Sequence, residues 1–392
     1  MYTIKCVNKI AKVGLKNLAP ARFVTDDGAD NPHGLLVRSA KLHDTVFGDN
    51  LLAIARAGAG VNNIPVADCA KKGIVVFNTP GANANAVREL TIGALILASR
   101  DLLGGLLWAK GLTGDDIAAQ VEKGKSAFAG PEIDGKTLGI IGLGAIGVGV
   151  ANAAHHLGME VIGYDPFISV DAAWGLSRNV RRAPDLKTIY AESDYITIHV
   201  PLNKDTRGFI NAETLGLMKD GVRIINLARG ELVNDADMLA ALDGGKAARY
   251  VTDFPNAEVI NNPKVVPLPH LGASTPESED NCAVMAAKEL SDFLLYGNIR
   301  NSVNFPDAEL PVSGSHGSRV GVLHENIPNV LSSISGIFGS QGQNVDNMIN
   351  KSRGEFAYTL MDTPASVSDA TVEKLKGIPG VIRVRVIAND ET

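Results

Sequence analysis

Residues 137–150 read TLGIIGLGAIGVGV. The first five residues are mainly apolar, which is typical of a buried strand, and the run from Ala145 onward, AIGVGVANAAHHL, has the composition of a helix. Between the two lies the pattern G-x-G-x-x-G, formed by Gly142, Gly144 and Gly147. A strand that passes through such a turn into a helix is the arrangement in which the pyrophosphate of a dinucleotide is bound. The stretch therefore predicts a βαβ nucleotide-binding unit.

Each part of this turn has a chemical reason. Glycines permit a tight turn and close approach of the backbone to a pyrophosphate, and the helix N-terminus offers N–H donors and the positive end of a dipole. The next predicted strand, EVIGYD, ends in Asp165, whose carboxylate can accept hydrogen bonds from ribose hydroxyls. No arginine closely follows Asp165 to receive a 2′-phosphate, so NAD is predicted rather than NADP. The alternative is a glycine-rich turn that binds nothing.

Short apolar strands alternate with helical segments along most of the chain. Before the glycine turn, strands are predicted at 35–39, 51–58 and 74–79, and a long helix is predicted at 83–103. A second long helix is predicted after the turn, at 275–296. The remaining strands are TLGIIGLG, MEVIGYDP, YITIHVP, RIINLARG and RYVTDF. Continuous apolar strands separated by helices are typical of parallel sheets covered on both faces. The predicted fold class is α/β, with two Rossmann-like or flavodoxin-like parallel-sheet domains.

The composition changes at residues 304–319, NFPDAELPVSGSHGSR, where proline, serine and glycine indicate a linker. Beyond it the pattern is strand–helix–strand–strand–helix–strand, which predicts a small βαββαβ sheet with two helices on one face. The predicted domains are residues 1–97 completed by 285–307 for substrate binding, 98–284 for nucleotide binding, a linker at 308–318 and a C-terminal unit at 319–392.

Composition narrows the class of partner. The net charge of -6 argues against nucleic acid or an anionic membrane as the main partner, because both select for basic surfaces. The longest apolar run, IGALILA, is too short to span a bilayer, and the first residues show no signal-peptide pattern. The three cysteines, Cys6, Cys69 and Cys282, lie far apart without metal-ligand spacing, which favours a reducing compartment and no metal site. A cytoplasmic protein is expected.

A second stretch, VVPLPHLGAST at 265–275, places His270 at the end of an apolar strand, between proline and glycine. An imidazole whose pKa lies near neutrality can take the proton of an alcohol while a nucleotide accepts hydride. Arg229, at the end of the strand RIINLARG, offers a guanidinium that matches a carboxylate, and Glu258 offers a carboxylate that can orient an imidazole. Spacing alone leaves open a structural salt bridge for Arg229, a surface position for Glu258 and a capped turn for His270.

These stretches resemble a known family. GLGAIG, LARGELVNDADMLAAL, VTDFPNAE and PHLGAST are similar to the D-isomer-specific 2-hydroxyacid dehydrogenases, and LLVRSA, ARAGAGVNNI and NTPGANANAVRELTIG extend the resemblance over nearly all of residues 1–300. The resemblance implies that Arg229, Glu258 and His270 form a catalytic trio and that NAD is the cofactor. It also implies oxidation of 3-phospho-D-glycerate to 3-phosphohydroxypyruvate, the first step of L-serine synthesis.

Further site residues follow from the resemblance. For the substrate, including its phosphate, it implies contacts from Arg38, Ser39, Arg56, Ala59, Gly60, Val61 and Asn83. For the cofactor it implies Gly142, Gly144, Ala145, Ile146, Gly147, Asp165, Pro201, Thr206, Ala228, Asp253 and His270. The turn at 59–61 would offer backbone N–H groups to the substrate carboxylate. His199, in the strand IHVPL, is interpreted as a packing residue.

Residues 319–392 resemble an ACT domain, the ligand-sensing module of amino-acid metabolism. The resemblance implies an L-serine site made of His324, Asn326 and Asn344, whose side chains offer the donors and acceptors that a zwitterion needs. Asn329 stands where the family usually has glycine, and asparagine tolerates a left-handed backbone. The alternative is a purely structural unit that helps to assemble a homodimer or homotetramer.

Two other functions remain open at this point. The same chemistry on another D-2-hydroxy acid, such as glycerate, hydroxypyruvate or lactate, fits the nucleotide-binding motifs equally well. A nucleotide-sensing binding protein that resembles a transcriptional corepressor shares the fold but requires a groove for a partner peptide. Arg38 and the C-terminal unit favour the phosphorylated substrate.

Overall fold

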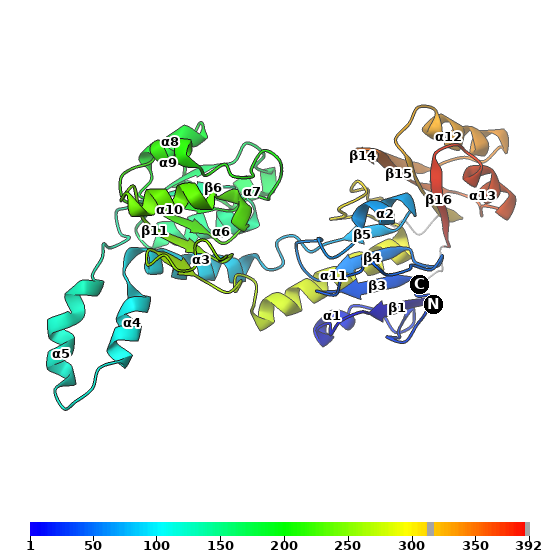
Figure 1. Ribbon diagram of the computed structural model, residues 1–392. Coiled ribbons are helices and arrows are strands. Elements are labelled where there is room, and N and C mark those ends of the chain that lie inside the picture. The colour runs from blue at the N-terminus through cyan, green and yellow to red at the C-terminus, as the bar shows by residue number, and fades with distance from the viewer. Residues whose placement is uncertain (312–316, 389–392) are drawn as a thin grey trace. The chain divides into compact units, whose positions relative to one another are not determined.

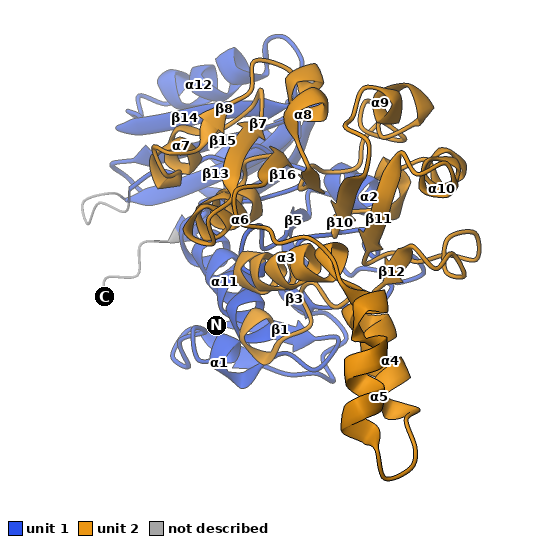
Figure 2. Cartoon of the chain, turned by 90° about the vertical axis from the view of Figure 1, so that its left-hand side faces the viewer, with its two compact units in different colours: residues 1–83, 279–392 blue, residues 84–278 orange. Residues whose placement is uncertain are grey.

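The computed structural model describes residues 1–311 and 317–388. The chain forms two compact units, one made of residues 1–83 and 279–392 and the other of residues 84–278 (Figure 2). The sequence predicts domain boundaries at 97/98 and 284/285, whereas the two compact units meet at 83/84 and 278/279. Part of the predicted linker, residues 312–316, lies outside the described residues.

A five-stranded parallel sheet organises the first unit, in the order β2-β1-β3-β4-β5. Its strands are β1 (Tyr2–Cys6), β2 (Phe23–Thr25), β3 (Gly34–Val37), β4 (Ala53–Arg56) and β5 (Val75–Phe77). The helices are α1 (Lys12–Leu15), α2 (Val66–Lys71) and α11 (Pro276–Tyr296). All four residues of β3 are buried, as expected for a strand covered on both faces. The core on one face joins Leu36 and Phe77 of the sheet to Leu290 and Phe293 of α11.

A seven-stranded parallel sheet organises the second unit, in the order β12-β11-β10-β9-β6-β7-β8. Its strands are β6 (Thr137–Ile141), β7 (Glu160–Tyr164), β8 (Arg181–Arg182), β9 (Tyr195–Ile198), β10 (Val222–Asn226), β11 (Ala247–Thr252) and β12 (Val265–Pro267). The covering helices are α3 (Ala84–Ser99), α6 (Ala145–His156), α7 (Val170–Gly175), α8 (Leu186–Glu192), α9 (Ala212–Gly216) and α10 (Asp235–Asp243). The strand order reverses at β6, which has β7 on one side and β9 on the other. Ligands of such sheets bind at the carboxyl ends of the strands beside this reversal.

The predicted helix at 83–103 is wrong in its extent, because it breaks between α3 and α4 (Leu102–Lys110). Asp101 lies at the break, and its carboxylate accepts a hydrogen bond from the N–H of Gly104 at 3.2 Å, which caps α4. The helices α4 and α5 (Ile117–Gly124) contain no buried residue and project from the unit as an arm (Figure 1). No single helix of the described residues is long and apolar enough to cross a membrane; α3 and α4 meet that test only together, and they are bent by 73°.

The C-terminal residues form an antiparallel sheet in the order β14-β15-β13-β16. Its elements are β13 (Ser318–Glu325), α12 (Val330–Ser340), β14 (Asn347–Arg353), β15 (Phe356–Thr363), α13 (Asp369–Lys376) and β16 (Val381–Ala388). The predicted βαββαβ order is confirmed. The helices cover one face, where Val322 and Met361 pack against Ile334, Phe338 and Leu375.

The other face of this sheet packs within the first unit. Leu323, Tyr358 and Leu360 belong to the same buried cluster as Phe77 and Phe293. The hydroxyl of Tyr358 donates to the carbonyl oxygen of Gly297 at 2.7 Å. The C-terminal sheet is therefore docked on the first unit by a shared apolar core rather than carried beyond it.

A buried ion pair reinforces this docking. Arg319 pairs with Asp362 at 2.7 Å, and their side chains are 3% and 0% exposed. The guanidinium also donates to the carbonyl oxygens of Tyr296, Leu310 and Pro311. Because a buried charge is costly unless it is paired and hydrogen-bonded, these bonds fix the sheet to the end of α11 and to the segment that follows it.

Candidate active site

The glycine turn between β6 and α6 has the geometry that the sequence predicts. Gly142 has a φ of 96°, and a Cβ there would lie 2.7 Å from the carbonyl oxygen of His199. A Cβ on Gly147 would lie 2.0 Å from the carbonyl oxygen of Gly142, so the helix can approach the strand only without a side chain. A Cβ on Gly144 would meet no atom within 4 Å. Gly144 therefore faces open space, which is what a bound pyrophosphate requires.

The residues around this turn fit the nucleotide of NAD. The N-cap of α6 is Gly144, which has no side chain to cap the first N–H groups of the helix. Asp165 follows β7, and its two oxygens accept hydrogen bonds from the N–H groups of Leu143 and Phe167, each at 2.8 Å. The carboxylate is thus held beside the glycine turn. Its free lone pairs suit the hydroxyls of a ribose.

Pro201 and Thr206 lie in the turn after β9. The hydroxyl of Thr206 donates to the carbonyl oxygen of Pro201 at 2.7 Å and accepts from the N–H of Asn203 at 2.8 Å, which closes the turn. His199 bonds Thr197 at 3.0 Å, and burial lowers the pKa of His199 to about 4. A neutral, strand-anchored imidazole agrees with the packing role that the sequence predicts for it.

Arg229 lies three residues after the end of β10, in a turn whose backbone is held by the side chain of Asn226. The amide of Asn226, which is fully buried, donates to the carbonyl oxygen of Arg229 at 2.8 Å and accepts from the N–H of Ala228 at 3.2 Å. Asn226 is not predicted as a site residue from the sequence, although a polar residue at the end of an apolar strand is a visible signal. The guanidinium itself is exposed and bonds only the carbonyl oxygen of Ala228 within the described residues.

His270 has a left-handed backbone, with a φ of 54°. Such a conformation costs a non-glycine residue about 1–3 kcal/mol and persists only where the surroundings enforce it. Asp253 enforces it, because its two oxygens accept hydrogen bonds from the N–H groups of Leu271 and Gly272 at 2.7 and 2.8 Å. Asp253 is 1% exposed, so the carboxylate that holds this loop is itself buried. In this structure, the predicted cofactor residue Asp253 holds the loop that carries His270.

One aromatic ring contacts both of the predicted catalytic side chains. The ring of Phe254 is 4.7 Å from the imidazole of His270, centroid to centroid, and the guanidinium carbon of Arg229 is 5.9 Å from the centroid of the same ring. Arg229 and His270, which are distant in the sequence, are therefore brought to one place at the carboxyl end of the sheet. Phe254 is not predicted as a site residue, because VTDFPNAE gives no sign of which way its ring faces.

Glu258 is not joined to this pair. It is exposed in the loop after β11, and in the described chain no hydrogen bond or ion pair links its carboxylate to His270. The local turn is set by Asn256, whose side chain accepts from the N–H groups of Glu258 and Val259. The structure thus assembles two members of the predicted trio and leaves the third apart.

The predicted substrate residues of the first unit gather after β3 and β4. The side chain of Asn8 accepts hydrogen bonds from the N–H groups of Arg38, Ser39 and Ala40, at 3.3, 3.1 and 2.9 Å, and so shapes the turn after β3. Arg56 donates from Nε to the carbonyl oxygen of Arg38 at 3.0 Å, which brings the two arginines together. These residues form a basic edge at the carboxyl ends of the strands.

Two further features define this edge. The guanidinium of Arg38 pairs with Glu279, at the start of α11, at 2.5 Å, and both side chains are partly exposed. The carbonyl oxygen of Ala59 accepts a hydrogen bond from the amide of Asn78 at 2.6 Å, which ties the predicted 59–61 turn to the end of β5. Asn83 is the last residue before α3. Glu279 and Asn78 were both missed in the sequence.

The predicted effector residues have different surroundings. His324 is 3% exposed, and its Nε2 lies 3.0 Å from the hydroxyl of Thr359 and 3.3 Å from Oδ1 of Asn350. Asn326 and Asn344 are exposed, and their amides donate to the carbonyl oxygen of Gly354 and to Asp346. Asn329 has a φ of 69° at the start of α12, so the left-handed backbone expected at this position is present.

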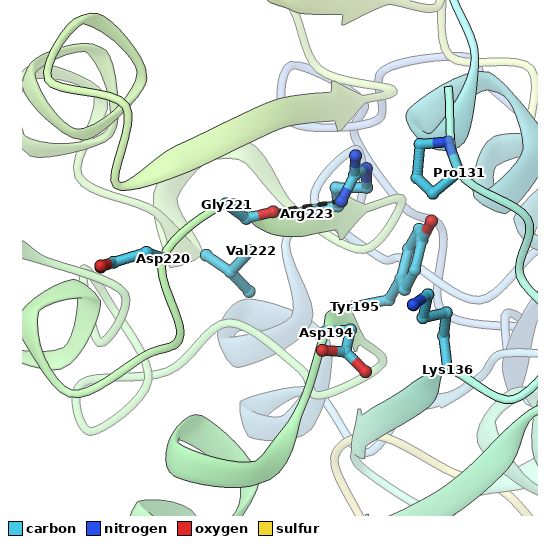
Figure 3. Close-up of a pocket in the computed structure, with 8 residues that line it drawn as sticks. All are labelled: Pro131, Lys136, Asp194, Tyr195, Asp220, Gly221, Val222 and Arg223. Atoms are coloured by element: carbon cyan, nitrogen blue, oxygen red, sulfur yellow. Dashed lines mark hydrogen bonds between the residues drawn. The ribbon is translucent and has the colours of Figure 1, made fainter. Parts of the chain in front are cut away.

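A small cavity of about 150 Å³ lies at the amino ends of the strands of the seven-stranded sheet, away from the carboxyl ends that carry the candidate site (Figure 3). It is found where β6, β9 and β10 begin, and it is lined by Pro131, Lys136, Asp194, Tyr195, Asp220, Gly221, Val222 and Arg223. Lys219 pairs with Asp194 at 3.0 Å and Lys246 pairs with Asp220 at 2.9 Å, so each carboxylate has a lysine as its counter-charge. None of the predicted site residues lines this cavity. Its position at the amino ends of the strands separates it from the glycine turn.

Comparison with known proteins agrees with this geometry. Residues 108–272 match the sequence profile described as D-isomer specific 2-hydroxyacid dehydrogenase, NAD binding domain. The D-3-phosphoglycerate dehydrogenase of Escherichia coli K12 is 33% identical over 371 residues, which cover 90% of this chain and 86% of that protein. The enzyme of the same name from Bacillus subtilis is 33% identical over 324 residues, but the match spans only 59% of its length.

A solved structure adds to this comparison. The NAD+-bound 3-phosphoglycerate dehydrogenase of Entamoeba histolytica superposes with a TM-score of 0.59 at 28% identity, covering 77% of this chain and 98% of that one. The glycine turn, Asp165 and the Arg229–Phe254–His270 group lie in the part of the chain that matches the family profile. The chain therefore belongs to the D-isomer-specific 2-hydroxyacid dehydrogenases and is an NAD-dependent dehydrogenase.

Proposed function

We propose that this dehydrogenase oxidises 3-phospho-D-glycerate to 3-phosphohydroxypyruvate with NAD, the first step of L-serine synthesis. The observation that carries the proposal is the placement of Arg229 and His270 around Phe254, at the carboxyl end of the sheet that holds the glycine turn. The names of the relatives from E. coli and E. histolytica support the choice of substrate. The proposal assigns hydride transfer to the second unit and recognition of the substrate phosphate to the first.

The proposed chemistry follows from the side chains. His270 accepts the proton of the C2 hydroxyl on an imidazole nitrogen, while the hydrogen on C2 leaves with its electron pair. NAD supplies the acceptor for that hydride. Arg229 binds the substrate carboxylate and polarises the oxygen that becomes the carbonyl. Asp253 keeps the imidazole in place by holding the backbone of Leu271 and Gly272, so the geometry is set before the substrate arrives.

Glu258 keeps the role that the resemblance gives it. A carboxylate hydrogen-bonded to the second nitrogen of His270 would fix the tautomer and stabilise the imidazolium. Because Glu258 is exposed in the loop that Asn256 shapes, forming this bond requires a movement of that loop. A Glu258→Gln variant with an unchanged pH profile of kcat would remove Glu258 from the mechanism.

The first unit is assigned the phosphate of the substrate and further hydrogen bonds to the carboxylate that Arg229 binds. Arg38, Ser39 and Arg56 provide the cationic edge for the phosphate, and the 59–61 turn provides N–H donors for a carboxylate. The ion pair between Arg38 and Glu279 favours a second candidate, because it occupies the guanidinium that a phosphate would need. The second candidate is a dehydrogenase of an unphosphorylated D-2-hydroxy acid.

Regulation and assembly complete the proposal. We infer that L-serine binds the C-terminal sheet at the loops of Asn326 and Asn344, supported by the left-handed Asn329 at the start of α12. Of the three predicted effector residues, His324 is left out of this proposal because it is buried beside Thr359. We infer a homo-oligomer formed through the arm, where Leu102, Leu103, Leu106 and Leu107 are between 44% and 63% exposed on α4. The stretch LLGGLL carries no charge, so two copies can pack without repulsion. The composition and the three free cysteines support a cytoplasmic location.

Steady-state assays test the substrate and the cofactor together. With NAD, kcat/KM should be highest for 3-phospho-D-glycerate among that acid, D-glycerate and D-lactate. With NADP, kcat/KM should be far lower, because Asp165 repels a 2′-phosphate. A higher kcat/KM for D-glycerate would establish the second candidate, and equal use of NADP would overturn the role of Asp165.

A further inference from the structure

Residues 297–310, here called the strap, run beside the last strand of the five-stranded sheet. Ser302 pairs with Phe77 in an antiparallel bridge, and the N–H of Val303 donates to the carbonyl oxygen of Val76 at 2.9 Å. β5 is the outermost strand on this side, so the strap covers an edge that would otherwise lack partners. The position of the strap along β5 is therefore fixed by backbone hydrogen bonds.

A buried amide sets the register of this pairing. Asn304 is 7% exposed, and its side chain accepts from the N–H of Val76 and donates to the carbonyl oxygen of Ile74, both at 2.9 Å. A shift by one residue would leave this amide unpaired in a buried place, which is costly. The strap and β5 thus behave as one element.

The strap also reaches the proposed carboxylate-binding turn. The carbonyl oxygen of Asn301 accepts from the N–H of Asn78 at 3.3 Å, and the side-chain amide of Asn78 donates to the carbonyl oxygen of Ala59 at 2.6 Å. Because the peptide between Ala59 and Gly60 is planar, fixing its carbonyl also fixes the direction of the Gly60 N–H. Asn78 therefore aims one of the donors of the 59–61 turn.

The same strap residues are held from the other side by the C-terminal sheet. Arg353, at the end of β14, donates from its guanidinium to the carbonyl oxygen of Ser302 at 2.5 Å. The ring of Phe356 lies 5.6 Å from that of Phe305, centroid to centroid. Ser302 is thus shared, since its backbone pairs with β5 while its carbonyl is bound by the C-terminal sheet.

Asn301, next to Ser302, shows that the strap is under constraint. It has a φ of 59°, and its amide donates to Oε1 of Glu289 on α11 at 2.7 Å. A left-handed asparagine persists where its contacts enforce it. Movement at Ser302 is therefore transmitted to Asn301 rather than absorbed by a relaxed loop.

We propose that the strap is a positioning element, through which Arg353 of the C-terminal sheet sets the orientation of the Gly60 N–H in the carboxylate-binding turn. The order of contacts is Arg353 to Ser302, Asn301 to Asn78, and Asn78 to Ala59. Arg353 and Asn78 touch no reacting atom, so they are positioning residues. The proposal rests on the proposed function of the 59–61 turn. It would supply a physical route by which a ligand of the C-terminal sheet could change substrate affinity.

The first test compares Arg353→Met with Lys351→Met, an exposed residue of the same strand. Arg353→Met should raise KM for 3-phospho-D-glycerate about two- to tenfold, the range that one hydrogen bond carries, at unchanged kcat and unchanged Kd for NAD. Hydrogen exchange at residues 58–62 should become faster in this variant, with Tm equal to that of Lys351→Met. Equal exchange and equal KM in the two variants would overturn the proposal.

The second test uses Asn78→Asp, which keeps the shape of the side chain but removes the donor to Ala59. Its KM should rise as in Arg353→Met, and the double variant should show less than the product of the two effects, because both changes act on one element. Independent effects would show that Arg353 does not act through Asn78, and would overturn the proposal.

Hydrogen exchange separates this proposal from the proposed function. If 3-phospho-D-glycerate is not turned over but exchange at 58–62 responds to Arg353→Met, the substrate assignment fails and the strap remains a link. If turnover is normal and exchange does not respond, the strap proposal fails alone.

Discussion

The ring of Phe254 lies against the imidazole of His270, with 4.7 Å between centroids and 52° between the planes. The same ring faces the guanidinium of Arg229, and the N–H of Phe254 donates to the hydroxyl of Thr252 at 3.1 Å. One half-buried ring thus contacts both a proposed base and a proposed carboxylate ligand. The positions of both proposed catalytic side chains should therefore depend on this ring.

Phe254→Ala should lower kcat/KM about tenfold. The ring contact with His270 is worth about 0.5–1.5 kcal/mol, and its loss frees the imidazole to leave the reactive geometry. Kd for NAD should stay within a factor of about two, because the glycine turn and Asp165 are untouched. Phe254→Tyr, which keeps the ring, is the matched control and should retain most activity. Parallel losses in both variants would assign the effect to the loop and not to the ring.

His270→Ala should lower kcat by about a hundredfold or more, which is the range for a general base. Fluorescence titration should give an unchanged Kd for NAD, since His270 lies outside the glycine turn. His43→Ala, which removes an exposed histidine of the first unit, is the control for surface effects. Retention of wild-type kcat in a folded His270→Ala protein would exclude this residue as the base.

Much of this site follows from sequence, and the missing part has a common cause. The glycine turn, Asp165, Arg229 and His270 lie at strand ends, and strand ends are visible as breaks in apolar runs. The missed residues act across distances that no local pattern records. Asn8 shapes the turn after β3 and Asn78 binds the turn after β4, and each choice of partner depends on the order of strands in the sheet. The break at Asp101 was also missed, because the apolar residues continue through it.

Glu279→Gln should improve use of the phosphorylated substrate. It removes the negative charge that pairs with Arg38 at 2.5 Å and leaves an amide that competes weakly for the guanidinium. KM for 3-phospho-D-glycerate should fall severalfold, while KM for D-glycerate should change little. The pair is partly exposed, so the effect should shrink at high salt.

Whereas Glu279→Gln frees the guanidinium of Arg38, Arg38→Ala removes it. If Arg38 binds the phosphate, its loss should raise KM for 3-phospho-D-glycerate about tenfold to a hundredfold and leave D-glycerate nearly unaffected. Equal losses for both substrates would identify Arg38 as a structural partner of Glu279 and favour the unphosphorylated substrate.

Stability should depend on pH through Glu289, a buried carboxyl on α11. Burial raises the pKa of Glu289 to about 8, against the opposing effects of the Asn301 hydrogen bond and the Arg300 charge; the charge of Asp307 adds to the rise. The folded state holds this proton more tightly than the unfolded state, so the stabilising contribution is complete below the unfolded pKa near 4.5 and is lost as pH rises through about 8. Among the described residues Oε2 of Glu289 has no hydrogen-bond partner, which agrees with a neutral group.

Glu289→Gln should therefore flatten the fall of Tm between pH 5 and pH 9. Glutamine keeps the size and the acceptor for Asn301 without a titrating group. Burial also raises the pKa of Asp292, so this carboxyl too should make Tm fall as pH rises. The Asp292→Asn variant measures that second contribution and separates it from the contribution of Glu289. A pH dependence of Tm that is the same in Glu289→Gln and in the wild type would show that this carboxyl is ionised in the fold.

L-serine should bind the C-terminal sheet and inhibit the enzyme. The residues best placed to meet a ligand are Asn326 and Asn344, because both are exposed and each amide makes a single local bond. His324 is enclosed between Thr359 and Asn350, so its expected part is to hold β13 against its neighbours. Asn344→Ala should therefore abolish inhibition at unchanged kcat, while His324→Ala should lower Tm as well.

Inhibition by L-serine should be tested with point variants and not by deleting the C-terminal sheet. Tyr358 and Leu360 share a core with Phe293, so a truncated chain would expose that core to solvent. An effector coupling is typically about 1–3 kcal/mol, which corresponds to a severalfold to hundredfold change in substrate affinity. If that coupling passes through the strap, Arg353→Met should weaken inhibition while calorimetry still detects L-serine, since the effector loops are intact. Calorimetry on the full chain that gives no heat with millimolar L-serine, together with unchanged activity, would leave the C-terminal sheet a structural part of the first unit.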